Sequence, residues 1–194
     1  MVLELCKSRA SSSSSGPTPQ ILPVKIHFKI VRDLLEEVRL DLERPHEFAA
    51  ERVGFLSCRA GNLPDGGMIL LAHSYHPVSD EDYLDDPSVG AMMGPGAIRK
   101  AMEYAYNNPV GMFHVHMHDH GGVPAFSRID RSESRKFVPD FWHVRPKMPH
   151  GAIVLSRDSA VGRCWIPGSS RTVAIDKITV VGAPIQIIRR DRNA

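Results

Sequence analysis

A segment in which histidines alternate with apolar residues constrains the fold of this 194-residue chain more than any other feature. Residues 110–120 read VGMFHVHMHDH. Because successive side chains point to opposite faces of a strand, this alternation predicts a strand with His114, His116 and His118 on one face. Residues two apart on that face lie roughly 6.5–7 Å apart, so two imidazoles can converge on one metal ion.

A carboxylate that could complete such a site follows the histidines. A catalytic zinc site uses three protein ligands and keeps one position open. Asp130, in the sequence Ser127-Arg-Ile-Asp130, comes just after a loop of glycine and proline that can fold back onto the strand end. The same S-x-x-D pattern is also typical of a helix start, with Ser127 at the N-cap and Asp130 at the third position. The two interpretations are compatible, since a cap also fixes the direction of the carboxylate.

The remaining sequence predicts strands and helices that alternate around one sheet. The strands are expected at 23–30, 52–58, 68–74, 110–118, 151–157 and 162–167, with one or two more in 177–189, and the helices at 31–42, 96–107 and 127–137. This order is typical of a single α/β or α+β domain with a mixed sheet flanked by helices. We expect residues 1–20, which include a run of five serines, to be a disordered tail, and residues 21–194 to form the domain.

Charge and composition argue against several classes of partner. Lys+Arg is 24 and Asp+Glu is 22, so no basic excess favours nucleic acid. No apolar run approaches the roughly 20 residues that a membrane span needs, and the first residues lack the pattern of a secretory signal. The three cysteines are widely spaced, which makes a disulfide framework unexpected. These features together predict a cytoplasmic protein that binds neither nucleic acid nor membrane.

Three segments together resemble the motif of the JAB/MPN (JAMM) zinc metalloproteases. They are Glu51-Arg-Val-Gly54 at the start of the second expected strand, His116-Met-His118, and Ser127-Arg-Ile-Asp130. The resemblance covers roughly residues 24–167. The longer form H-x-H-x-H-D-H-G-G-x-P-x-F-S-x-x-D is similar to prokaryotic branches of the family, including deubiquitinase-like peptidases of bacterial ubiquitin-like conjugation systems.

The resemblance implies a fold, a cofactor and a reaction. The fold would be a single JAB/MPN domain with a layout similar to cytidine deaminases. Zn²⁺ would be held by His116, His118 and Asp130, with Glu51 as the general base and Ser127 as a donor to the oxyanion. The implied substrate is an amide bond after the C-terminal glycine of a ubiquitin-like protein or its conjugates, and E1- or E2-like proteins of the same system are possible partners.

Two alternatives concern the residues of the site. The family has about seven residues between its second histidine and the serine; eight residues separate His118 from Ser127 here, which favours the pair His116 and His118. The sequence GMFHVH also aligns with the family's strand entry in a way that selects His114 and His116. Glu47 is a rival to Glu51, although the spacing to the following glycine favours Glu51.

Other functions remain open beside the isopeptidase. A related metalloenzyme could process a sulfur-carrier-like precursor or a small-molecule amide. A non-catalytic MPN-type scaffold would lack the ligand set that this chain retains. A zinc deaminase would need a C-x-x-C motif, which the sequence does not contain.

Overall fold

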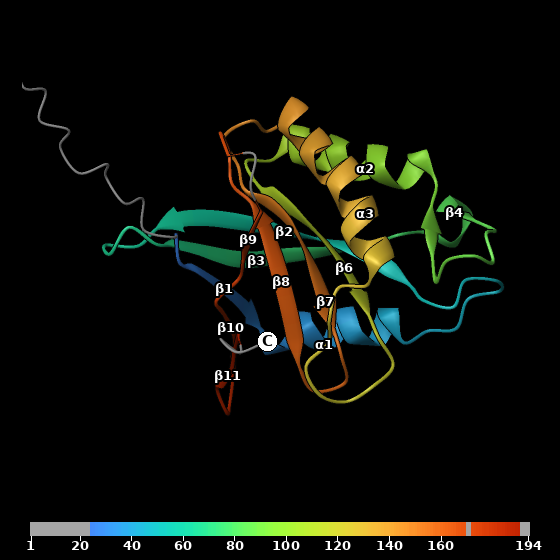
Figure 1. The fold of residues 1–194 in the computed structure, drawn as a ribbon, viewed down its shortest axis with the longest axis horizontal. Coiled ribbons are helices and arrows are strands. Elements are labelled where there is room, and N and C mark those ends of the chain that lie inside the picture. Colours follow the sequence, from blue (N-terminus) through green and yellow to red (C-terminus); the bar gives the residue numbers. More distant parts are fainter. Residues whose placement is uncertain (1–23, 170–171, 191–194) are drawn as a thin grey trace, which may run out of the picture.

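The computed structural model describes residues 24–169 and 172–190, and these form one mixed sheet with helices on both faces (Figure 1). The predicted tail, residues 1–20, lies outside the described residues. The helices are α1 (Arg32–Leu42), α2 (Pro95–Asn107) and α3 (Arg128–Phe137), with short 3-10 helices η1 (Asp80–Asp82) and η2 (Val138–His143). The strands are β1 (Ile26–Val31), β2 (Val53–Asn62), β3 (Met68–Pro77), β4 (Tyr83–Leu84), β5 (Met92–Met93), β6 (Gly111–Met117), β7 (His150–Leu155), β8 (Ala160–Trp165), β9 (Thr172–Ala174), β10 (Lys177–Val181) and β11 (Gln186–Arg189).

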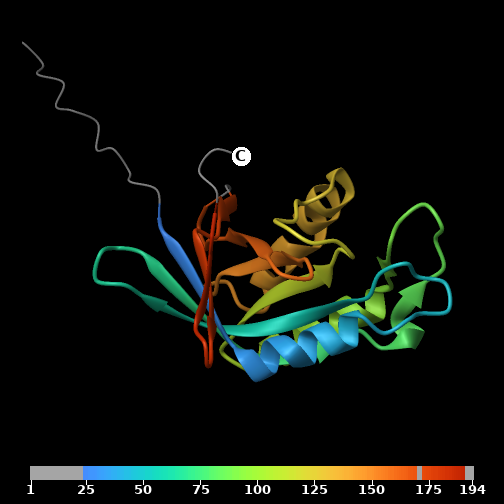
Figure 2. The ribbon, with the colours of Figure 1, turned by 90° about the horizontal axis from the view of Figure 1, so that it is seen from below.

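The large sheet has nine strands in the order β11-β10-β1-β3-β2-β6-β7-β8-β9, and β4 and β5 form a separate pair. β1 runs parallel to both β10 and β3, and β6 runs parallel to β7, whereas the other neighbours are antiparallel. Figures 1 and 2 show that the sheet is strongly curled. The prediction of a mixed sheet flanked by helices is therefore confirmed.

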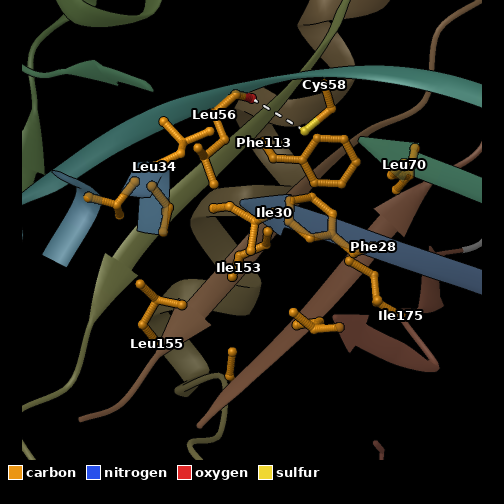
Figure 3. Close-up of a cluster of buried hydrophobic side chains, with 14 of the residues drawn as sticks. Phe28, Ile30, Leu34, Leu56, Cys58, Leu70, Phe113, Ile153, Leu155 and Ile175 are labelled. Carbon is orange, nitrogen blue, oxygen red and sulfur yellow. Dashed lines mark hydrogen bonds between the residues drawn. The ribbon is translucent and has the colours of Figure 1, made fainter. Parts of the chain in front are cut away.

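Alternation along the central strands sends side chains into two separate cores. On β2, Leu56 and Cys58 enter a core that is covered by α1, which we call the α1-side core (Figure 3). Val53 and Phe55 of the same strand enter a second core beneath α2, α3 and η2, which we call the α3-side core. Burying a side chain of this size contributes about 1.5–3 kcal/mol, so both faces of the sheet fix the register of its strands.

Strand β6 follows the predicted division of faces. Phe113, Val115 and Met117 lie in the α1-side core, where the ring of Phe113 is 5.8 Å from that of Phe28. Met112 lies in the α3-side core. The histidines of β6 share the face of Met112, and they therefore point toward α3.

Helices α1 and α2 each bury one apolar face. Leu34, Val38 and Leu42 of α1 form a buried stripe, and the helix ends before Pro45. Helix α2 begins with Pro95 at its first position and buries only alanines toward the sheet: Ala97, Ala101 and Ala105. These small side chains let α2 lie close to the sheet.

Some elements differ from the predictions. β2 and β3 are longer than expected because they pair as one hairpin over nearly their whole length, from Gly54 with Pro77 to Asn62 with Met68. The sequence pattern did not predict β4, β5, β9 or η2. No helix in the described ranges has the length and apolar character to cross a membrane.

Candidate metal centre

His116 of β6 and His118, just after the end of that strand, bring their ring nitrogens together. The strand is paired on both sides, with His116 opposite Val53 of β2 and Val154 of β7, so its backbone is held firmly. The Nε2 atoms of His116 and His118 lie 3.3 Å apart. His116 is only 2 % exposed, whereas His118 is half-buried at the edge of a cavity.

Glu51 lies two residues before β2, and its carboxylate is close to the ring nitrogens of His116 and His118. Its backbone N–H donates to the carbonyl of Gly90 at 3.0 Å, which ties it to the loop before β5. The carboxylate and the two histidines each offer a ligand atom, and these atoms all lie within 4.8 Å of one another. Glu47 is exposed and does not line the cavity, so the structure brings Glu51 to the histidines and leaves its rival outside.

Asp130 approaches from the first turn of α3. Its Oδ1 is 3.4 Å from Nε2 of His116, and its Oδ2 is 3.9 Å from Nε2 of His118. The predicted helix cap is confirmed: the backbone N–H of Ser127 donates to Oδ2 at 2.6 Å, and that of Asp130 donates to Oγ of Ser127 at 3.0 Å. The cap therefore engages Oδ2 at the helix start and leaves Oδ1 facing His116.

The electrostatics of Asp130 favour the charged carboxylate. Burial by itself raises the pKa of this group, but the hydrogen bond and charge of His116 and the two contacts of Ser127 outweigh burial and hold the pKa below its usual range. The carboxylate is thus ionised under any ordinary condition and suited to a cation.

His114 lies one step farther along the strand and belongs to the wall of the site. Its ring centre is 5.5 Å from that of His116, and the rings of Phe55 and Phe137 stand edge-on to it at 5.8 and 5.3 Å. Burial, followed by the repulsion of His116, lowers the pKa of His114 to about 3, so its imidazole is neutral. Of the two alternative pairs, His116 and His118 are the histidines whose nitrogens converge with Glu51.

All of these groups line one cavity of about 490 Å³. Its polar lining includes Glu51, the three histidines, Asp130 and Ser127, together with Glu133 and Lys136 of α3. Its apolar lining includes Val89, Met92, Met93, Ile98, Phe126, Ile129 and Phe137. A largely apolar lining with a few convergent polar groups is typical of a ligand-binding site.

A buried arginine holds the segment that carries Glu51. The guanidinium of Arg52 donates to the carbonyls of Arg44 and Pro45 at 3.0 and 3.1 Å, and to Oδ1 of Asp80 at 2.7 Å. The hydrogen bond from Arg52 lowers the pKa of the Asp80 carboxyl. The irregular chain between α1 and β2 therefore has a fixed end just beside Glu51.

Gly54 is needed for packing against a tyrosine. A Cβ at this position would overlap the ring of Tyr75 from the neighbouring strand β3. The hydroxyl of Tyr75 in turn donates to Oδ2 of Asp41 on α1 at 2.7 Å. The ring of Tyr75 is therefore the reason that this position of the Glu51-Arg-Val-Gly54 segment holds a glycine.

The loop between β6 and α3 is anchored to the turn that joins β7 and β8. Oγ of Ser156 donates to the carbonyl of Gly122 at 2.6 Å, and the N–H of Gly122 donates to Asp158 at 2.7 Å. The N–H of Arg157 donates to the carbonyl of His120 at 3.0 Å. These bonds define the path of the chain from His118 to Ser127.

Several residues of the site could not be found from the sequence. Gly90, Met92 and Met93 belong to an irregular segment with no periodic pattern, and only the tertiary structure places them against Glu51. Phe137 had a signal, because it is the last residue of the helix predicted at 127–137. The donor set of two imidazoles and two carboxylates suits a divalent transition metal.

Comparisons with known proteins add little. No family model and no curated protein matches the chain. Among solved structures, the Trichoplax adhaerens STIL N-terminal domain is similar at 11% sequence identity with a TM-score of 0.31. The match covers 70% of this chain and 40% of that one, and at this TM-score it carries no argument about fold or function.

Proposed function

We propose that this chain is a zinc-dependent isopeptidase or peptidase of the JAB/MPN type. One observation carries the proposal: Nε2 of His116 lies 3.3 Å from Nε2 of His118 and 3.4 Å from Oδ1 of Asp130. Two ligand atoms bound at about 2.0–2.1 Å to a tetrahedral zinc ion stand roughly 3.3–3.4 Å apart. These two spacings match two edges of a zinc coordination tetrahedron, and the third pair, Nε2 of His118 and Oδ2 of Asp130, is 3.9 Å apart.

The chain's residues then divide into ligands and reacting groups. His116, His118 and Asp130 would hold the ion, which leaves one position open. When bound, zinc would supply Lewis-acid polarisation of a carbonyl and make water more acidic. Glu51, within 4.8 Å of the histidine nitrogens, would accept a proton from water and return it to the departing amine.

Ser127 is the residue that we assign to the carbonyl oxygen. Its Oγ accepts the N–H of Asp130, and no residue in the described ranges accepts its own proton. That proton is free to be donated to the negative charge that develops on a carbonyl oxygen in the cavity. One hydroxyl would thus cap α3 and stabilise the oxyanion.

The substrate class follows from the resemblance to the family and from the shape of the cavity. The cavity lining includes Met92 and Met93 of β5, a strand that in the described residues pairs with β4 on one side and is an edge on the other. An extended tail can add to such an edge through backbone hydrogen bonds. The tail of a ubiquitin-like protein that ends in glycine has this form, and E1- or E2-like proteins of the same system are proposed as partners.

The test combines metal content and cleavage. The protein is purified without a metal-affinity tag, zinc is measured by mass spectrometry, and ubiquitin-like fusions with linear and isopeptide extensions are offered with and without a chelator. We expect one zinc per chain and cleavage after the terminal glycine that the chelator stops. A folded chain without zinc would refute the proposal, and cleavage of linear extensions alone would favour precursor processing over deconjugation.

A further inference from the structure

Two neighbouring histidines each bury a ring nitrogen that has no partner. In the described part of the chain, Nε2 of His114 and Nδ1 of His116 are both buried and make no hydrogen bond. Their ring centres are 5.5 Å apart, with the planes inclined by 40°. Both rings lie on the α3 side of β6 and line the cavity of the proposed zinc site.

The nitrogen of His116 is the one that needs an acceptor. A histidine that binds metal through one nitrogen carries its proton on the other, and that N–H is normally donated to a neighbouring acceptor. Nε2 of His116 is the nitrogen near His118 and Asp130, so when it binds the ion the proton of the neutral imidazole is on Nδ1. A buried N–H without an acceptor is unfavourable, so the Nδ1–H of His116 needs a hydrogen-bond acceptor nearby.

His114 is suited to supply that acceptor. A neutral imidazole has one acceptor nitrogen, and Nε2 of His114 has no competing partner. Phe55 and Phe137 stand edge-on to its ring and confine it. Rings whose centres are 5.5 Å apart can be joined by a direct hydrogen bond after a small rotation, or by one water molecule.

We propose that His114 is a positioning residue for the metal centre: its Nε2 accepts the Nδ1–H of His116, directly or through one water, and holds His116 in the tautomer that presents Nε2 to the ion. This inference rests on the proposed zinc site. It gives His114 a role outside the ligand set of His116, His118 and Asp130.

The first test measures zinc affinity in the full chain by competition with a chromophoric chelator. His114→Phe keeps an aromatic ring between Phe55 and Phe137 and removes the acceptor, so zinc should bind about 10–100-fold more weakly. His114→Gln retains an acceptor and should recover most of that loss. His120→Gln, which removes an exposed histidine from the same stretch, is the matched control and should leave the affinity unchanged.

The second test uses only the wild-type protein. Long-range proton–nitrogen NMR of the zinc-loaded wild type should show His116 protonated on Nδ1, with a proton that exchanges slowly with water. Rapid exchange of that proton, or an affinity of His114→Phe within twofold of wild type, would overturn the inference. So would loss of zinc in His114→Phe as complete as in His116→Ala, because His114 would then be a ligand.

Failure of the inference and failure of the zinc proposal give different results. If the wild type does not bind zinc, or if His116→Ala binds it as tightly as the wild type, the zinc site itself is refuted. If His116→Ala abolishes binding and His114→Phe does not weaken it, only the role of His114 is refuted.

Discussion

At the scale of single residues, the two carboxylates of the candidate centre differ in what holds them. Oδ2 of Asp130 is engaged by the N–H of Ser127, which leaves Oδ1 at 3.4 Å from His116. The carboxylate of Glu51 packs against Gly90, where a Cβ would be only 3.0 Å away. One carboxylate is therefore fixed by a helix cap, as a ligand should be, and the other is placed by a loop.

This difference predicts opposite phenotypes for two conservative variants. Glu51→Gln should keep one zinc per chain, while cleavage falls by about 10²–10⁴-fold because the proton acceptor is lost. Asp130→Asn should lose zinc and cleavage together. Metal analysis and cleavage rates check both, with Glu47→Gln as the exposed control. Zinc loss in Glu51→Gln with retention in Asp130→Asn would exchange the two roles.

A second residue-scale prediction concerns His150, a fully buried histidine of β7. Its Nδ1 accepts the N–H of Met112 at 3.0 Å, and its ring stacks on Phe141 at 5.4 Å. Burial lowers the pKa of His150 to about 4, against about 6.5 in the unfolded chain. Between these values the unfolded state binds more protons, so this group's stabilisation is present above pH 6.5 and is lost as pH falls toward 4.

The loss should amount to about 3 kcal/mol of the free energy of unfolding. Denaturant unfolding between pH 4 and 7.5 measures it, and His150→Asn should show a flatter pH profile than the wild type. His143→Asn removes an exposed histidine and should keep the wild-type profile. Equal slopes for the wild type and His150→Asn would contradict the assignment.

At the scale of elements, the packing of β2 against β3 depends on the absence of a side chain at Gly54. Because a Cβ on residue 54 would overlap the ring of Tyr75, Gly54→Ala should lower the free energy of unfolding by about 1–3 kcal/mol. In a Tyr75→Ala background the same change should cost much less, since the ring is gone. Gly61→Ala, in the same strand, meets only a methyl group of Ile69 at 3.3 Å and is the control. Additive effects of Gly54→Ala and Tyr75→Ala would show that the ring is not the obstacle.

The individual elements also show how much of the fold could be predicted from the sequence. The strand with the histidines could be predicted because its two faces differ in chemistry, and the start of α3 because Ser127 and Asp130 form a local cap. Both depend on interactions between residues close in the chain. The mixed sheet followed from the order of strands and helices.

Other features could not be predicted because they depend on distant contacts. The packing of Tyr75 on Gly54, the anchoring of the Glu51 segment by Arg52, and the pairing of β4 with β5 all join residues that are far apart or in irregular chain. Strand β9 is three residues long and pairs only at the edge of β8, so its sequence carries no periodic signal. The convergence of Glu51 with His116 was expected from the resemblance alone.

At the scale of the whole molecule, the candidate centre joins three separate segments of the chain. Glu51 precedes β2, His116 and His118 come from the end of β6, and Asp130 comes from α3. Helix α3 is bound to the sheet mainly through Phe137 and its neighbours in η2, and its first turn through the site. An ion held by β6 and α3 would therefore tie the start of α3 to the centre of the curled sheet.

This arrangement predicts that zinc stabilises the whole domain and not the site alone. At a free zinc concentration 100 times the dissociation constant, the free energy of unfolding should rise by about 2.7 kcal/mol, because the ion binds only the folded chain. Calorimetry should record a higher melting temperature, and hydrogen exchange should show the added protection concentrated in the first turns of α3. His116→Ala should remove both effects, and His143→Ala should retain them. A zinc-induced rise that persists in His116→Ala would place the ion elsewhere and separate α3 from the metal.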